Sequence, residues 1–116
     1  MKKIFISQPM VDKTDKEILQ VRNEITEICK TIFDGEEIEI LDSFFQGAPH
    51  DAKPLWFLGK AFQILSQADV AFFAKGWDQY RGCKMEHQAA RQYGIQCYTW
   101  YDNIDEAGGY AEESDD

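Results

Sequence analysis

The chain has 116 residues, of which 44% are hydrophobic and 14% aromatic, and its formal net charge is −9. This length suits one domain with a single core, and the apolar content excludes a largely disordered chain. The acidic balance argues against recognition of a phosphate backbone, because nucleic-acid binding needs a basic face, so we expect no nucleic-acid partner.

The first half of the chain predicts a strand, a helix and a second strand. Residues 2–6 (KKIFI) read as the first strand, and Thr14 with Glu17 has the spacing of a capping box that starts a helix. That helix is expected to end at residues 34–35 (Asp-Gly), and residues 37–41 (EIEIL) alternate as in a strand. The buried face of the helix is predicted from apolar residues that recur every three or four positions: Ile18, Val21, Ile25, Ile28 and Ile32.

The second half repeats this alternation. An irregular connection leads to Pro54, which suits the first turn of a second helix. Residues 70–74 (VAFFA) form a continuous apolar run, typical of a strand that is buried on both faces. A third helix is predicted from about residue 83 to residue 93 and stops at Gly94, and residues 95–101 (IQCYTWY) read as the last strand.

Strands and helices therefore alternate along the chain in the order β-α-β-α-β-α-β. This order predicts an α/β fold with three layers (α/β/α), flavodoxin/Rossmann-like, built on a four- to five-stranded parallel sheet with right-handed crossovers. We expect one domain over residues 1–101. Residues 102–116 contain seven acids and no base, which predicts an acidic, flexible C-terminal tail.

Two further features bear on where the protein works. No apolar run reaches the length of about 18 residues that a membrane-spanning helix requires, so we expect no membrane partner. The apolar part of MKKIFIS is shorter than the central region of a signal peptide, and the three cysteines lack a CxxC spacing. We therefore predict a cytoplasmic protein with free thiols at Cys29, Cys83 and Cys97.

The predicted fold indicates where a ligand would bind. In an open parallel sheet, ligands bind beyond the carboxyl ends of the strands, where the strand order reverses. Residues 7–10, residues 42–45 and residues 76–86 are expected to meet at this edge. The candidate substrate-binding residues of the first two segments are Ser7, Gln8, Pro9, Met10 and Asp42.

Glu86 is the candidate catalytic residue of the third segment. It falls close to the start of the third helix, where the positive helix end would keep a carboxylate ionised and available as a nucleophile or a base. The alternative is that Glu86 only complements the helix dipole, as acids in first helical turns commonly do.

The residues before Glu86 are further candidates for substrate binding. Arg81 could hold a phosphate or a carboxylate beside the amides of the helix, and Gly82 would let the backbone come close. The alternative for Arg81 is a solvated side chain or an ion pair with a nearby acid such as Asp78. Trp77 and Tyr80 could stack on a flat heterocycle.

Other residues near this edge leave two possibilities open. Ser7 could bind an anion or could serve only as a turn residue. Phe44 and Phe45 could stack on a ligand or could pack beneath a loop. Cys83 and His87 share a helix face and could hold a metal or form a nucleophile pair, but no paired ligand motif supports either role, so we predict no metal and no cofactor.

Three segments together resemble the nucleoside 2-deoxyribosyltransferase-like superfamily: ISQPM after the first strand, QADVAFFAKGW in the middle, and RGCKMEHQAARQYGI after it. The chain is most similar to a small uncharacterised family of bacterial and phage proteins within that superfamily, over nearly all of residues 1–101. The resemblance implies that Glu86 attacks the anomeric carbon of a deoxyribosyl group and that Ser7 and the following loop hold the sugar or the 5′-phosphate. It also implies a homo-oligomer.

The leading hypothesis is therefore an enzyme that processes the N-glycosidic bond of a nucleoside or nucleotide, as an N-glycosidase or a deoxyribosyltransferase. The alternative is a protein that binds a small nucleotide without turning it over, in order to sense or sequester it. This alternative arises because the relatives carry an acid on the helix before the central strand, where this chain reads GKAFQ (residues 59–63).

Overall fold

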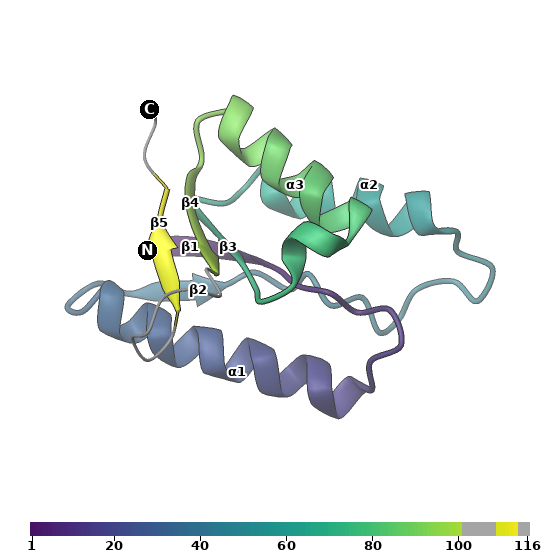
Figure 1. The fold of residues 1–116 in the computed structure, drawn as a ribbon, viewed down its shortest axis with the longest axis horizontal. Helices are drawn as coiled ribbons and strands as arrows, with labels where there is room; N and C mark the ends of the chain where they lie inside the picture. The colour runs from purple at the N-terminus through teal and green to yellow at the C-terminus, as the bar shows by residue number, and fades with distance from the viewer. Residues whose placement is uncertain (101–108, 114–116) are drawn as a thin grey trace.

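The computed structural model describes residues 1–100 and 109–113 (Figure 1). It shows an α/β fold with a five-stranded, mostly parallel sheet and three α-helices over these residues. The elements in chain order are β1 (Lys2–Ser7), α1 (Asp15–Ile32), β2 (Ile38–Ile40), α2 (Pro54–Leu65), β3 (Val70–Phe73), the 3₁₀ helix η1 (Trp77–Gln79), α3 (Arg81–Gln92), β4 (Gln96–Trp100) and β5 (Tyr110–Glu112).

The strand order across the sheet is β2-β1-β3-β4-β5. The strands β1 to β4 pair in parallel, as predicted, whereas β5 pairs antiparallel with β4. The chain moves outward from β1 to β2 and then crosses to the other side of β1 for β3, so the strand order reverses between β1 and β3. Ser7, the last residue of β1, lies opposite Phe73, the last residue of β3, at this reversal.

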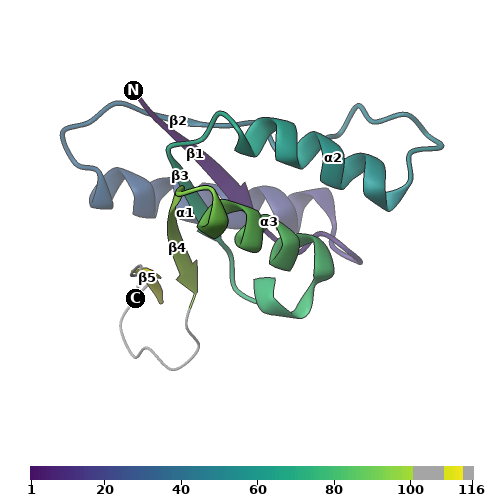
Figure 2. The same ribbon diagram turned by 90° about the horizontal axis from the view of Figure 1, so that it is seen from above.

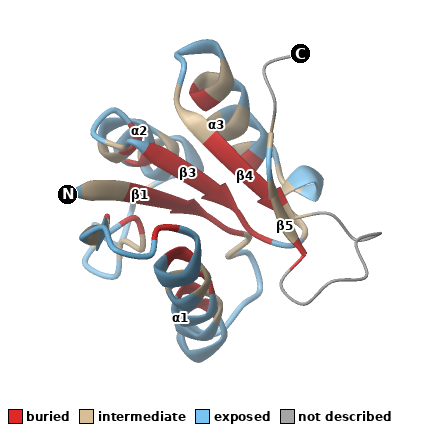
Figure 3. Ribbon diagram, turned by 90° about the vertical axis from the view of Figure 1, so that its left-hand side faces the viewer, coloured by how far each residue is buried: buried red, intermediate tan, exposed pale blue. Residues whose placement is uncertain are grey.

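The two faces of the sheet carry separate cores (Figure 3). Helix α1 covers one face, where Ile4, Ile6, Val70 and Phe72 of the strands pack against residues such as Ile25. Helices α2 and α3 lie side by side on the other face (Figure 2). The strand residues that face them are the alternate ones, Phe5, Ala71, Phe73 and Cys97. Burial on both faces explains why β1 and β3 read as continuous apolar runs.

Local signals explain the helix ends. The Thr14 side chain accepts a hydrogen bond from the backbone N–H of Glu17 (3.1 Å), and the Glu17 carboxylate accepts one from the backbone N–H of Thr14 (3.2 Å), which forms the predicted capping box. Pro54 occupies the first turn of α2. Helix α3 starts two residues before the predicted position 83 and is followed by Gly94, whose φ of 76° suits glycine.

The apolar stripe of α1 differs from the prediction. The buried residues of this helix are Ile18, Arg22, Ile25 and Cys29. The predicted positions Val21 and Ile28 are only partly buried and Ile32 is exposed, so the buried face runs through Arg22 and Cys29 instead. The helix is therefore rotated slightly from the orientation that apolar spacing alone would give.

Residues 110–113 lie inside the segment that was expected to be a flexible tail, yet they contact the domain. The strand β5 brings the Tyr110 ring to 5.8 Å from that of Phe72, between ring centroids. The Glu113 carboxylate lies 2.5 Å from Nε2 of His87 and 3.5 Å from Nε of Arg91, both on α3. The remainder of the predicted tail, residues 102–108 and 114–116, lies outside the described residues. Within the described part of the chain, no helix has the length and apolar character needed to cross a bilayer.

Candidate functional site

A cavity of about 1170 Å³ lies at the carboxyl ends of β1 and β3, where the strand order reverses. It is lined by residues 5–11, residues 43–45, the start of α2 and residues 79–86. These include residues from each of the three segments that sequence analysis placed at this edge. A smaller hollow of about 460 Å³ at the opposite edge is lined by Met1, Lys2, Glu36, Glu37 and Asp69, and none of the candidate residues lies there.

Ser7 and Glu86 meet in the cavity. The Ser7 hydroxyl donates a hydrogen bond of 2.5 Å to Oε1 of Glu86, although the two residues are 79 positions apart in the chain. Ser7 is buried at the end of β1, and Glu86 is half-buried in the second turn of α3. The parallel sheet makes this contact possible, because β3 ends at the same edge as β1 and α3 begins shortly after β3.

The environment of Glu86 differs from the prediction. Burial raises the pKa of the Glu86 carboxyl from 4.5 to about 7, and the hydrogen bond from Ser7 opposes this rise only in part. The helix end therefore does not keep this group fully charged at neutral pH. A carboxyl whose neutral and ionised forms are both populated near pH 7 can accept or release a proton as well as attack an electrophile.

The charged residues that line the cavity are mainly basic. Arg81, Lys84 and Lys53 line the cavity, and Glu86 is the one carboxylate among the lining residues that the structure describes. The first turns of α2 and α3 also line the cavity and contain no acid, and in the described residues the side chains of their N-cap residues, Lys53 and Tyr80, accept no hydrogen bond from the helix amides. Gly82 lies in this first turn of α3. These features together favour a ligand with an anionic group.

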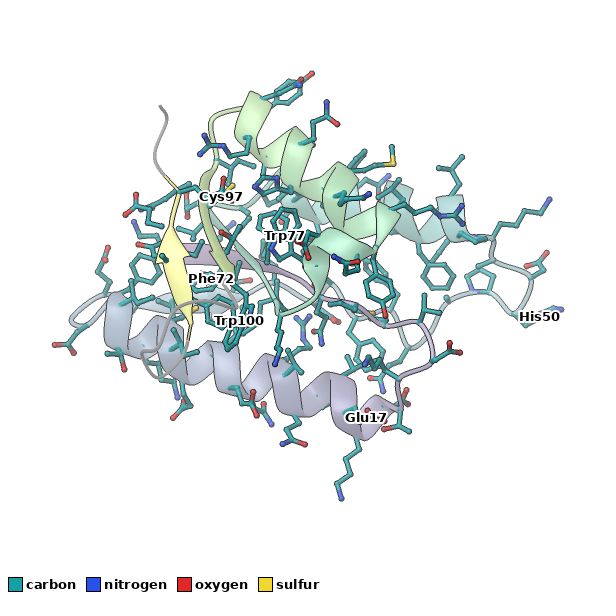
Figure 4. The ribbon with its side chains drawn as sticks, viewed as in Figure 1. Glu17, His50, Phe72, Trp77, Cys97 and Trp100 are labelled. Carbon is teal, nitrogen blue, oxygen red and sulfur yellow. The ribbon has the colours of Figure 1, made fainter. Side chains whose placement is uncertain are left out.

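The aromatic residues divide into two groups. Tyr80 lines the cavity, as do Phe44 and Phe45. Trp77 does not line it: its ring packs 5.6 Å from that of Phe73 and 4.4 Å from that of His87, beside α3 (Figure 4). We therefore assign Trp77 a packing role and leave the stacking role to the aromatic residues that reach the cavity.

The loop residues after β1 and β2 also have distinct roles. Pro9 and Met10 line the cavity. Gln8 lines it too, but its side chain is engaged elsewhere, because its Nε2 donates to the backbone oxygen of Ile18 at 3.1 Å. Asp42 is exposed and does not line the cavity; its Oδ1 accepts a hydrogen bond from the backbone N–H of Phe44 (3.3 Å) and shapes the turn there.

Cys83 and His87 do not form a common site. Cys83 is buried and lines the cavity, and burial raises the pKa of its thiol to about 11, which leaves it protonated and a poor nucleophile. The His87 ring instead lies beside Phe73 and Trp77 and contacts Glu113. Among residues 1–100 and 109–113, no group of three or more His, Cys, Asp or Glu side chains is placed to hold a metal ion.

Arg22 is the residue that sequence analysis missed. Its buried guanidinium donates hydrogen bonds to the backbone oxygen of Leu41 (2.9 Å), Oγ of Ser43 (3.0 Å) and Oε1 of Gln8 (3.4 Å). Gln8 and Ser43 both line the cavity. A signal was present in the sequence, since Arg22 lies four residues after Ile18 and three before Ile25, on the face that those two residues bury.

No protein-family model, curated protein or solved structure matches this chain. The cavity and the residues around it therefore carry what can be inferred about function.

Proposed function

We propose that the protein cleaves or transfers the N-glycosidic bond of a nucleoside or nucleotide, with Glu86 as the attacking carboxylate. The observation that carries this proposal is the Ser7–Glu86 hydrogen bond inside the large cavity at the strand-order reversal. We also propose that the fold is the three-layer, flavodoxin/Rossmann-like arrangement, which the strand order β2-β1-β3-β4 and the helices on both faces of the sheet support.

The proposed reaction has two steps. In the first, an ionised Glu86 oxygen forms a bond to the anomeric carbon while the bond to the base nitrogen breaks, and the base leaves with the electron pair and takes a proton from solvent. In the second, water or a second nucleobase attacks the anomeric carbon and loses a proton to solvent, while the bond to the Glu86 oxygen breaks and releases the carboxylate. The developing positive charge on the sugar in each step is stabilised by the nearby negative charge of Glu86.

The cavity offers a group for each part of such a substrate. Ser7 orients Glu86 through its hydroxyl. Arg81, with Lys84 beside it, would bind a 5′-phosphate, and Gly82 would allow it to approach the first amides of α3. Tyr80 and the loop aromatics Phe44 and Phe45 would stack on the base.

One observation favours the second candidate, a protein that binds a nucleotide without cleaving it. Glycoside hydrolysis commonly uses two carboxyl groups, and Glu86 is alone among the described residues that line the cavity. In this reading the same residues bind the base and the phosphate, but the leaving base receives no help from a general acid. Recovery of an unaltered nucleotide from the purified protein would favour binding alone.

The experiment that separates the two is an assay for free base. The protein is incubated with a panel of nucleosides, deoxynucleosides and their 5′-monophosphates, and the products are resolved by chromatography. We expect base release that Glu86→Gln abolishes and that Glu39→Gln, a change to an exposed residue of β2, leaves intact. Release that persists in Glu86→Gln, or no release from any substrate, would contradict the enzyme proposal.

We also propose that the protein forms a homo-oligomer. Val11, Leu55 and Met85 line the cavity, and their relative exposures are 63%, 74% and 47%. Exposed apolar side chains gathered around a cavity favour association.

A further inference from the structure

Arg22 is a buried cation: burial lowers the pKa of its guanidinium, and the attraction of the exposed Asp42 carboxylate opposes this only in part. The structure records no ion pair for it within the described residues, and its three acceptors are uncharged: the Leu41 carbonyl, the Ser43 hydroxyl and the Gln8 amide. Burying a charged group costs free energy that neutral acceptors recover only in part. An apolar residue would continue the buried stripe of α1 at a lower cost in free energy, so the hydrogen bonds of Arg22 point to a role beyond packing.

The hydrogen bonds of Arg22 reach both neighbours of Ser7 in the chain. On one side, Arg22 bonds to Ser43, whose Oγ donates to the backbone oxygen of Ile6 at 2.9 Å. On the other side, Arg22 bonds to Gln8, whose Nε2 is anchored to Ile18 one turn earlier in α1. The residues before and after Ser7 are thus both tied to the same helix.

Ser7 depends on this support for its direction. It is the last residue of β1: its backbone oxygen still accepts a hydrogen bond from the N–H of Ala74 (2.9 Å), but among the described residues no strand pairing holds the residue after it. The place of the Ser7 hydroxyl follows from its backbone, so a shift of Ile6 or Gln8 would lengthen or misalign its 2.5 Å hydrogen bond to Glu86. The guanidinium is suited to this task because its planar fork presents several donors in fixed directions, which an ammonium does not.

We propose that Arg22 is a positioning residue for the site: by fixing Ile6 and Gln8 on either side of Ser7, it sets the hydrogen bond between Ser7 and Glu86. Arg22 itself is not among the residues that line the cavity. The importance of this role for catalysis rests on the proposed function, but the positioning can be measured in the free protein.

The test is the titration of the Glu86 carboxyl, followed by NMR of ¹³C-labelled glutamate and assigned with Glu86→Gln. Ser7→Ala removes the hydrogen bond that favours the ionised form, so its midpoint should rise by about half a pH unit or more. We expect Arg22→Met to raise the midpoint to the value of Ser7→Ala, and the double variant to show no further rise. A midpoint of Arg22→Met equal to that of the wild type, or a shift that adds in full to that of Ser7→Ala, would overturn the proposal.

Matched variants separate positioning from a general loss of stability. Ile25→Val alters another buried residue of α1 that packs in the core, and it should lower stability without moving the Glu86 midpoint. Arg22→Lys keeps the charge without the fork and should give an intermediate midpoint. Ser43→Ala breaks only the branch to Ile6 and should shift the midpoint less than Ser7→Ala does. If Arg22→Met does not fold, unchanged midpoints in both Arg22→Lys and Ser43→Ala would refute the proposal.

The outcome is independent of the base-release assay. A protein that releases no base can still show the linked titrations, which would sustain the positioning role and remove only the enzyme proposal. If the protein releases base but the Arg22 variants titrate as the wild type does, the enzyme proposal is sustained and the positioning role of Arg22 is removed.

Discussion

At the scale of single residues, the position of Glu86 sets a conflict between stability and chemistry. The proposed attack requires an ionised carboxylate, yet burial favours the neutral form of Glu86 and raises its pKa to about 7. The folded protein therefore binds a proton at Glu86 between about pH 4.5 and 7 that the unfolded chain has released. Stability from this group is complete below pH 4.5 and is lost as the pH rises through about 7.

We predict that Glu86→Gln, which keeps a neutral side chain of the same shape, stabilises the protein above pH 7 relative to the wild type. The gain should be about 1–3 kcal/mol at pH 8 and smaller at pH 5. Urea unfolding of both proteins at the two pH values measures this difference, in which contributions from other groups cancel. A difference between the two proteins that is the same at both pH values would contradict the raised pKa.

The sequence predicts the location of these residues better than their directions. Ser7 and Glu86 were expected at the same edge because parallel strands bring their carboxyl ends together whatever their side chains are. Trp77 was expected at the same edge, yet its ring turns toward Phe73 and His87, since the space beneath α3 needs a large apolar group. Such a choice depends on packing partners from distant segments, which local sequence does not encode.

At the scale of elements, the least predictable part is the C-terminal strand. Its acidic composition predicts a solvated tail. In the structure, however, Glu113 contacts His87 and Arg91 on α3, and the Tyr110 ring packs against Phe72. These partners lie far away in sequence, so composition alone could not reveal them. The rotation of α1 has the same origin: Arg22 is turned inward by acceptors on Leu41, Ser43 and Gln8, and this overrides the apolar spacing.

We predict that Glu113→Ala lowers the free energy of unfolding by about 1–3 kcal/mol, because it removes the carboxylate partner of the partly buried His87 ring and one contact of the Arg91 guanidinium. Hydrogen exchange should then accelerate more for the amides of α3 than for those of α1, because the contacts between residue 113 and α3 are lost. The exposed neighbour Glu112 provides the control, since Glu112→Ala should cost much less. Chemical unfolding with hydrogen exchange measures both effects, and equal losses in the two variants would contradict the role of Glu113.

At the scale of the whole molecule, the charge of the cavity opposes that of the chain. The protein carries a net charge of −9, whereas Lys53, Arg81 and Lys84 line the cavity with Glu86 as the single described acid. An anionic ligand is therefore repelled by the protein at long range and attracted at short range. Salt screens both the long-range repulsion and the short-range attraction, with a Debye length of about 10 Å at 0.1 M. Because the three cations are exposed, their attraction for the ligand weakens as salt is added.

We predict that a nucleoside 5′-monophosphate binds more tightly than its nucleoside and that this advantage shrinks between 0.05 and 0.5 M salt, as expected for partly exposed ionic contacts. Arg81→Gln should reduce the advantage by roughly 3- to 10-fold, because one exposed cation contributes modestly to binding. Lys16→Gln, on the exposed face of α1, removes the same charge away from the cavity and should leave the advantage unchanged. Calorimetry measures the affinities of the nucleoside and of the monophosphate at each of the two salt concentrations. Equal affinities for the two ligands at low salt would mean that the cations of the cavity do not bind the phosphate.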